Sequence, residues 1–303
     1  MVSRSEPVVG RYWQLDIQGR EHRVYVEEAG AGIPLVCLHT AGADSRQYRH
    51  LLNDADVTRR FRVIAFDMPW HGKSSPPVGF QDEPYTLTPQ SYVAGIMAVV
   101  RGMGLKQPVV MGCSIGGRAV LHLLLAHPGE IGAAIGLQSS RTIVGVMSPY
   151  QRELQYMDRN DVHAGEAVAA LVSGIMAPQS PAAERWETLW HYMQGGPGVM
   201  QGDTAYYKET GLLRDEDLAR IDTARTPVYL LTGEYDYGAT PAHGAEVARL
   251  VPGAKFQVMK EVGHFPPSEN YPALRPWLLP VLQELHEHFD KQSPANQSQG
   301  RDK

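Results

Sequence analysis

The chain has 303 residues, of which 43% are hydrophobic and 20% charged, and its formal net charge at pH 7 is −5. This length exceeds that of a typical single-core unit, so we expect one catalytic domain that carries an insertion. The mild acidity and the lack of a clustered basic face exclude nucleic acid and anionic membranes as expected partners. A small-molecule substrate is the partner that remains. The oligomeric state does not follow from the sequence.

Strands are predicted along the chain at residues 24–28, 35–39, 63–67, 109–113, 133–138, 228–233 and 256–259, and helical segments separate most of them. Alternation of this kind predicts an α/β fold with a mainly parallel central sheet and helices on both faces. Ligands of such folds bind at the carboxyl ends of the strands, so candidate site residues are sought there.

The alternation lapses between residues 141 and 221, where the sequence becomes helical and is interrupted by Pro178, Pro181 and Pro197. We therefore predict a core of residues 1–140 and 222–290, with 141–221 inserted as a helical cap. The polar residues 291–303 are expected to form a disordered tail. Most Met, Tyr and Trp residues of the cap are expected to form its own core, and others to line the substrate pocket. The predicted pocket residues are His39, Thr40, Trp186, Trp190, Met193 and Phe265.

Cys37 and Cys113 are the only cysteines, and both fall in predicted buried strands. No disulfide framework is expected, and no metal is expected because no cysteine or histidine has metal-ligand spacing. No cofactor is expected either. The N-terminal residues lack the apolar core of a signal peptide, and no stretch reaches the roughly 18 apolar residues of a membrane span. These features predict a cytoplasmic protein.

Ser114 lies between two glycines, in Gly112-Cys-Ser-Ile-Gly116, directly after an apolar run and before a helical segment. A sharp turn from strand to helix would hold this serine in a strained conformation and expose its hydroxyl. The amino end of the following helix favours negative charge on a nearby oxygen. Ser114 is therefore the candidate nucleophile.

A serine needs a base to take its proton and a carboxylate to orient that base. Asp236 follows the predicted strand 228–233 and is the candidate acid, whereas Glu234 is an alternative two residues earlier. His264 lies in a loop after the predicted strand 256–259 and is the candidate base.

Two further histidines and one aspartate also lie near strand ends. His39 and His71 are alternative bases, although His39 is better placed to fix a loop and His71 a turn. Asp67 ends a predicted strand, and its commoner role is to accept hydrogen bonds from the turn that follows.

The order nucleophile, acid, base along the chain resembles that of the α/β-hydrolase superfamily, and the resemblance covers about residues 20–290. Residues 38–42, Leu-His-Thr-Ala-Gly, resemble the oxyanion loop of that family, and residues 67–74 resemble its Asp-x-x-Gly-x-Gly-x-Ser turn. Thr40 and Trp70 stand where the family commonly has glycine. The resemblance implies an oxyanion hole formed by the backbone N–H groups of Ala41 and Ile115.

This resemblance also implies a serine hydrolase that cleaves a carboxylic ester, thioester or lactone of a small or medium-sized apolar substrate. The main alternative is hydrolysis of a carbon–carbon bond in a ring-cleavage product, for which Arg118 would bind an acid group if it is not part of a structural ion pair. Acyl transfer to another alcohol is a further alternative, whereas haloalkane dehalogenation is disfavoured by serine at the elbow. A ligand-binding relative with a silent triad is the alternative from a different class.

Overall fold

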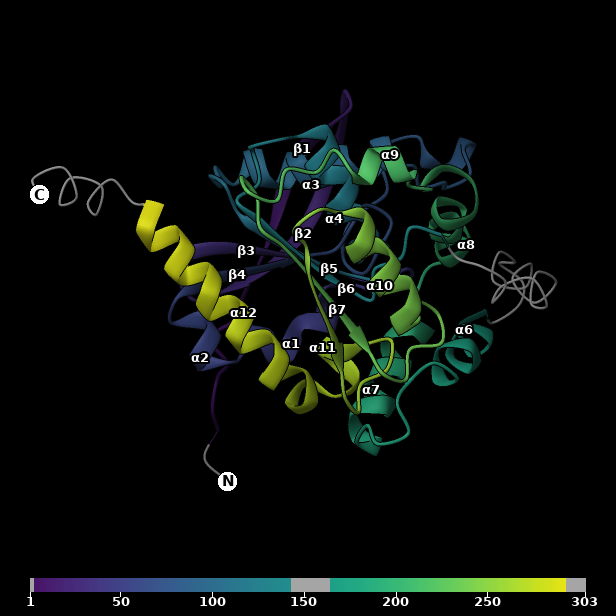
Figure 1. Cartoon of the computed structure of the whole chain (residues 1–303). Coiled ribbons are helices and arrows are strands. Elements are labelled where there is room, and N and C mark those ends of the chain that lie inside the picture. The colour runs from purple at the N-terminus through teal and green to yellow at the C-terminus, as the bar shows by residue number, and fades with distance from the viewer. Residues whose placement is uncertain (1–2, 143–163, 293–303) are drawn as a thin grey trace, which may run out of the picture.

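The computed structural model describes residues 3–142 and 164–292. Within them, one eight-stranded sheet has helices on both faces (Figure 1). The sheet order is β1-β2-β4-β3-β5-β6-β7-β8. The strands are β1 Val9–Ile17, β2 Arg20–Ala29, β3 Ile33–Leu38, β4 Phe61–Phe66, β5 Val109–Cys113, β6 Ala133–Leu137, β7 Val228–Gly233 and β8 Lys255–Met259.

The six strands from β3 to β8 are parallel, whereas β1 and β2 form an antiparallel hairpin whose second strand pairs with β4. The α/β class and the mainly parallel sheet expected from the sequence are confirmed. All seven predicted strands are present, within a few residues at each end. Strand β1 was missed because most of its side chains are exposed, with only Leu15 and Ile17 buried, so its hydrophobic signal is weak.

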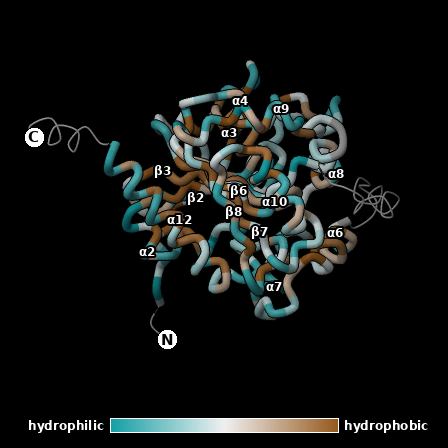
Figure 2. Tube along the Cα trace, in the orientation of Figure 1, coloured by the Kyte–Doolittle hydropathy of each residue, from teal (hydrophilic) through white to brown (hydrophobic). Residues whose placement is uncertain are grey.

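Alternate residues of the parallel strands point to opposite faces of the sheet, and each face is covered by its own helices. One face packs against α3 (Pro89–Gly102), α4 (Ile115–Ala126) and α10 (Pro241–Leu250). The other packs against α12 (Tyr271–Gln292) and the short helices near the amino end. Figure 2 shows the hydrophobic residues concentrated along the central strands. The remaining helices of the core are η1 Ser45–Tyr48, α1 Arg49–Leu52, α2 Ala55–Thr58, η2 Phe80–Asp82 and α11 Pro266–Glu269.

Several described helices lie between β6 and β7, and this part of the chain is hereafter called the β6–β7 insertion. Its described helices are α6 Ala164–Ser173, α7 Ala182–Met193, α8 Val199–Ala205, η3 Tyr206–Thr210 and α9 Asp215–Leu218. Apolar residues of α6, α7 and α8 pack with Ala43 and Phe265, which lie in the loops after β3 and β8. The insertion therefore covers loops at the carboxyl ends of the strands.

Two expectations about chain ends and membranes can be compared with the structure. Helix α12 continues to Gln292, so the first two residues of the predicted tail are helical. The rest of that tail and residues 143–163 of the predicted cap lie outside the described residues. Among the described helices, none combines the length and the apolar character that crossing a bilayer requires.

The turn from β5 into α4 places Ser114 at φ 58° and ψ −111°, a conformation that L-residues rarely adopt. A Cβ atom on Gly112 would lie 2.2 Å from the backbone of Gly116, and one on Gly116 would lie 2.6 Å from the carbonyl oxygen of Leu38. These glycines are therefore required by contact between backbones and not only by local flexibility.

We predict that Gly112→Ala lowers the free energy of unfolding by about 1–3 kcal/mol, because the added methyl group meets backbone that cannot move aside. Gly95→Ala is the control. A Cβ atom at this position meets no atom within 4 Å, and the substitution removes a glycine from the interior of α3. The control should gain about 0.5–1 kcal/mol. Urea denaturation of both variants measures the difference, and equal stabilities would contradict the steric account of the elbow.

Candidate active site

Three side chains from separate loops form one hydrogen-bonded chain at the carboxyl edge of the sheet. The Ser114 Oγ atom lies 2.8 Å from Nε2 of His264, and Nδ1 of His264 lies 2.8 Å from Oδ1 of Asp236. Ser114 is 5% exposed, His264 is 7% exposed and Asp236 is 1% exposed. Ser114 follows β5, Asp236 follows β7 and His264 follows β8, so the sheet brings together the three residues that the sequence singled out.

The hydrogen-bond partners define the state of the imidazole. Asp236 accepts at Oδ1 from the backbone N–H groups of Gly238 and Ala239, at 2.7 and 2.9 Å, which fixes the carboxylate in its loop. It also accepts from Nδ1 of His264, so Nε2 of the neutral ring is the acceptor for the Ser114 hydroxyl. Burial lowers the pKa of His264, but the charge and hydrogen bond of Asp236 outweigh burial and raise the pKa overall.

The two residues proposed for the oxyanion hole lie at the same edge of the sheet as Ser114. Ala41 lies after β3, which neighbours β5, and Ile115 is the first residue of α4. Neither N–H group has a hydrogen-bond partner among the residues that the structure describes. Unpaired donors at a helix amino end and in an adjacent loop can accommodate an anionic oxygen.

Tyr207, in η3 of the insertion, also contacts the serine hydroxyl. The Tyr207 hydroxyl lies 2.5 Å from Oγ of Ser114. Because Ser114 donates to His264, Tyr207 is the donor in this second bond. Burial raises the pKa of Tyr207, so its hydroxyl keeps its proton. The sequence prediction did not include this residue, because no local pattern links a tyrosine in a helical insertion to a serine 93 positions earlier.

Arg118 is fully buried in α4, beneath the ring of Tyr207. Its guanidinium carbon lies 4.5 Å from the ring centroid of Tyr207, and its Nε donates to the carbonyl of Ser140 at 2.7 Å. No carboxylate among the described residues pairs with it, so the ion pair weighed in the sequence analysis is not found there. Burial lowers the pKa of Arg118. Its charge is solvated mainly by carbonyl oxygens and the ring.

The alternative bases have other partners. His39 donates from Nδ1 to the carbonyl of Thr40 at 2.8 Å and accepts at Nε2 from the N–H of Met68 at 3.1 Å. His71 lies 3.0 Å from the carbonyl of Pro69 and 2.9 Å from Oδ2 of Asp203. Both histidines are therefore engaged in loop structure.

The alternative acids are also engaged elsewhere. Asp67 accepts from the backbone N–H groups of Ser45 and Lys73, each at 2.7 Å, and so stabilises the turn after β4. Glu234 pairs with Lys260 at 2.8 Å and is not part of the chain that ends at Ser114.

A second buried carboxylate supports the loop of His264. Glu269 accepts at Oε1 from the N–H of Gly263 at 2.5 Å, and from the N–H of Ala177 and the hydroxyl of Ser180, both at 3.3 Å. Burial raises the pKa of Glu269 to about 7. Glu269 joins the loop of His264 to the insertion, and no pattern in the sequence pointed to it.

The structure places some of the predicted pocket residues near His264 or in the loop after β3, and others on the surface. Phe265 packs edge-to-face against His264, with ring centroids 4.9 Å apart, and Thr40 is buried in the loop after β3.

Trp186 and Trp190, by contrast, are 62% and 52% exposed. Their expected place in the pocket needs correction: they lie on the outer face of α7, because the helix turns Tyr192 inward instead. Tyr192 packs against Phe265 at 5.3 Å between ring centroids. His39 is buried and bonded to the carbonyl of Thr40 in the loop after β3, and Met193 is half-buried at the end of α7.

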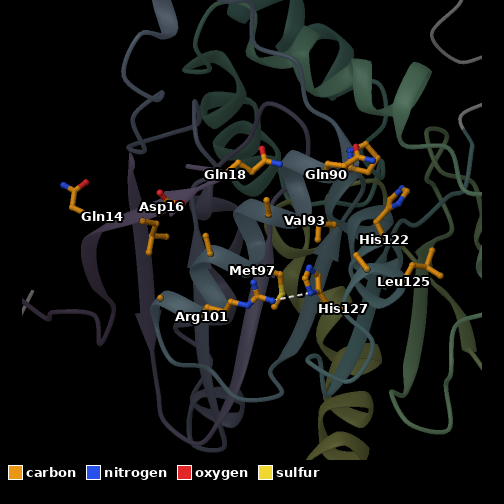
Figure 3. A pocket seen from close by; sticks show the side chains of 16 residues that line it. Gln14, Asp16, Gln18, Gln90, Val93, Met97, Arg101, His122, Leu125 and His127 are labelled. Atoms are coloured by element: carbon orange, nitrogen blue, oxygen red, sulfur yellow. Dashed lines mark hydrogen bonds between the residues drawn. The ribbon is translucent and has the colours of Figure 1, made fainter. Parts of the chain in front are cut away.

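A hollow of about 910 Å³ lies between β1, α3 and α4, and Figure 3 shows the side chains that line it. Val93, Met97 and Leu125 are among its apolar residues, and Arg101 and His127 lie at one side. Ser114, Asp236 and His264 are not among its lining residues, so this hollow is separate from the hydrogen-bonded chain.

Cys37 and Cys113 are both buried and both unbridged, as expected. In the described parts of the chain, no cluster of three His, Cys, Asp or Glu side chains could hold a metal ion.

Comparisons with known proteins agree with this fold. A relative from Burkholderia cepacia, a 2-hydroxy-6-oxo-6-phenylhexa-2,4-dienoate hydrolase, is 22% identical over 93% of this chain and 99% of its own. A carboxylesterase of Bacillus subtilis is 24% identical over 76% of this chain and 73% of its own. The solved structure of a thermophilic esterase from Thermogutta terrifontis superposes with a TM-score of 0.76 and 16% identity, covering 91% of this chain and 99% of the esterase.

The model of the α/β-hydrolase fold family matches residues 33–271. That range includes the elbow serine, the acid and the histidine described above, as well as the loop after β3 and the whole insertion. The chain therefore belongs to the α/β-hydrolase fold family.

Proposed function

We propose that this protein is a serine hydrolase that cleaves a carboxylic ester, lactone or thioester through an acyl-enzyme. The observation that carries the proposal is the hydrogen-bonded chain from Ser114 through His264 to Asp236, with the serine at the amino end of α4. Such a chain supplies a nucleophile, a general base and a carboxylate that orients the base. The mechanism requires no cofactor.

In the proposed reaction, His264 takes the proton of Ser114 as the serine oxygen attacks the substrate carbonyl carbon. The N–H groups of Ala41 and Ile115 donate to the resulting oxyanion, and each such donor contributes about 3 kcal/mol in the transition state. His264 then protonates the leaving alcohol. Water, deprotonated by the same histidine, attacks the acyl group and releases the acid and the free serine.

The groups beside the proposed site favour a substrate with an apolar or aromatic part. Phe265 and Tyr192 form an aromatic pair next to His264, and residues of α6 and α8 extend this apolar cluster. Apolar walls of this kind bind hydrophobic groups and limit the access of water. We therefore propose a small or medium-sized ester beneath the β6–β7 insertion, which would act as the cap.

We predict that a fluorophosphonate labels the protein at Ser114 and that Ser114→Ala abolishes both labelling and hydrolysis of p-nitrophenyl esters. The loss in kcat should be on the order of 10⁴-fold or more, and His264→Ala should cause a similar loss because the two residues act as a unit. Ser75→Ala is the control, since Ser75 lies in a partly exposed loop and is not bonded to Ser114, His264 or Asp236. A folded protein that is never labelled would instead favour the non-catalytic ligand-binding alternative.

A second prediction concerns pH. Only neutral His264 can accept the serine proton, so kcat/KM should fall as the pH drops through the raised pKa of His264. In Asp236→Asn the stabilising carboxylate is gone and burial dominates, so the midpoint of the acidic limb should move to lower pH. The rate itself should fall by on the order of 10⁴-fold. An unchanged midpoint in the pH profile of the variant would show that another group controls the limb.

The carbon–carbon hydrolase alternative is supported by the end-to-end match to the Burkholderia cepacia hydrolase. We expect p-nitrophenyl esters of graded chain length to be cleaved with a higher kcat/KM than a ring-cleavage dienone. Steady-state assays with both substrate classes, and with Ser114→Ala as the blank, decide between the two. Turnover of the dienone alone would reverse the assignment.

A further inference from the structure

The loop that carries the proposed oxyanion donor Ala41 is held on both sides by residues of the β6–β7 insertion. On one side, the Thr40 hydroxyl forms a short hydrogen bond with the hydroxyl of Tyr192 in α7. On the other side, the N–H of Gly42 donates to Oδ2 of Asp203 in α8 at 2.7 Å. Both bonds are buried, and they join segments 152 and 161 positions apart in the sequence.

Asp203 is fully buried and has three donors. Besides Gly42, it accepts from Nε2 of His71 at 2.9 Å and from the hydroxyl of Tyr85 at 2.6 Å. The other ring nitrogen of His71 faces the carbonyl of Pro69, so both nitrogens face acceptors and the ring is protonated. Burial opposes ionisation of both partners, but their mutual attraction outweighs it, lowering the pKa of Asp203 and raising that of His71. Asp203 is therefore a fixed carboxylate in a fully paired network.

Hydrogen bonds fix the two peptide planes that flank Ala41. The carbonyl of Thr40 accepts from Nδ1 of His39 at 2.8 Å and from the N–H of Ala43 at 3.2 Å. In a trans peptide the N–H of Ala41 points opposite to that carbonyl, so these bonds also direct the Ala41 N–H. The next peptide plane contains the N–H of Gly42, and the hydrogen bond of that N–H to Asp203 fixes it.

The loop also approaches α8 closely. Gly42 has φ +68°, and a Cβ atom there would lie 2.6 Å from the Met200 side chain of α8. Backbone at Gly42 is thus in direct contact with the insertion, and its position depends on where α8 lies.

We infer that Asp203 and Tyr192 are positioning residues for the oxyanion hole, so that the insertion completes the hole as well as covering the site. This inference rests on the proposed function. It gives a role to Thr40, which stands where glycine is common in related chains: the threonine hydroxyl is the group that Tyr192 holds. Neither positioning residue needs to touch substrate, because Tyr192 holds the side chain of Thr40 before Ala41 and Asp203 holds the backbone of Gly42 after it.

The test uses the full-length protein with Asp203→Asn, Tyr192→Phe and Thr40→Val. Each variant loosens the loop, so kcat for a p-nitrophenyl ester should fall by about 10- to 100-fold while KM changes by less than about threefold. The affinity for a trifluoromethyl ketone, which forms a tetrahedral adduct with serine, should fall by the same factor as kcat. Thr40→Ser keeps the hydroxyl and should retain both values.

Thr188→Val is the matched control, because Thr188 is equally buried on α7, one turn before Tyr192, and its hydroxyl has no partner among the described residues. Thermal unfolding checks that each variant is folded, and if Asp203→Asn is not, Tyr192→Phe and Thr40→Val decide the matter alone. Unchanged kcat and ketone affinity in folded variants would overturn the inference, as would a rise in KM alone. A wild-type protein that does not react with fluorophosphonate would instead refute the proposed function.

Discussion

The site depends on one steric constraint, the sharp turn by which β5 enters α4. Ser114 has a positive φ angle, and Gly112, Gly116 and Gly117 around it leave no room for side chains. A Cβ atom on any of them would meet the backbone of another of these glycines or of a neighbouring strand. That packing holds the hydroxyl at the amino end of α4, where the helix dipole and free N–H groups favour negative charge. The strain at Ser114 persists because β3 and β6 hold the strand end of the turn, while Gly116 and Gly117 at the helix end lie against the carbonyl oxygens of Leu38 and Leu137.

The positions of Asp236 and His264 follow from the same sheet. Both lie after strands on one side of β5, and Gln138, at the end of β6, links their two loops. Its side chain accepts from the N–H of Gly233 at 2.8 Å and donates to the carbonyl of Gly263. The imidazole and the carboxylate are therefore held by backbone contacts as well as by their own bond.

Much of this arrangement could be predicted from the sequence, because its signals are local. The glycines around Ser114, the strand before Asp236 and the loop of His264 are each short segments with a recognisable pattern, and parallel strands bring their carboxyl ends together. The hairpin strand β1 lacks such a pattern, since its side chains are mostly exposed. For Trp186 and Trp190, composition alone could not determine which face of α7 turns inward.

The residues that the sequence did not reveal act across long distances in the chain. Tyr207 contacts Ser114, Asp203 contacts Gly42, and Glu269 joins the loop of His264 to the insertion. Each of these groups is buried and polar, and each has at least one hydrogen-bond partner across the boundary between the insertion and the core. Because a buried polar group without its partner is costly, these contacts also determine how the insertion sits.

The central proposal is that Ser114 forms an acyl-enzyme through a tetrahedral intermediate whose oxyanion is held by backbone N–H groups. A crystal structure of the protein inactivated with a small alkyl fluorophosphonate tests it most directly. The account predicts phosphorus bonded to Oγ of Ser114, with the phosphoryl oxygen about 3 Å from the nitrogen atoms of Ala41 and Ile115. An adduct on another residue, or a phosphoryl oxygen directed away from both nitrogen atoms, would contradict it.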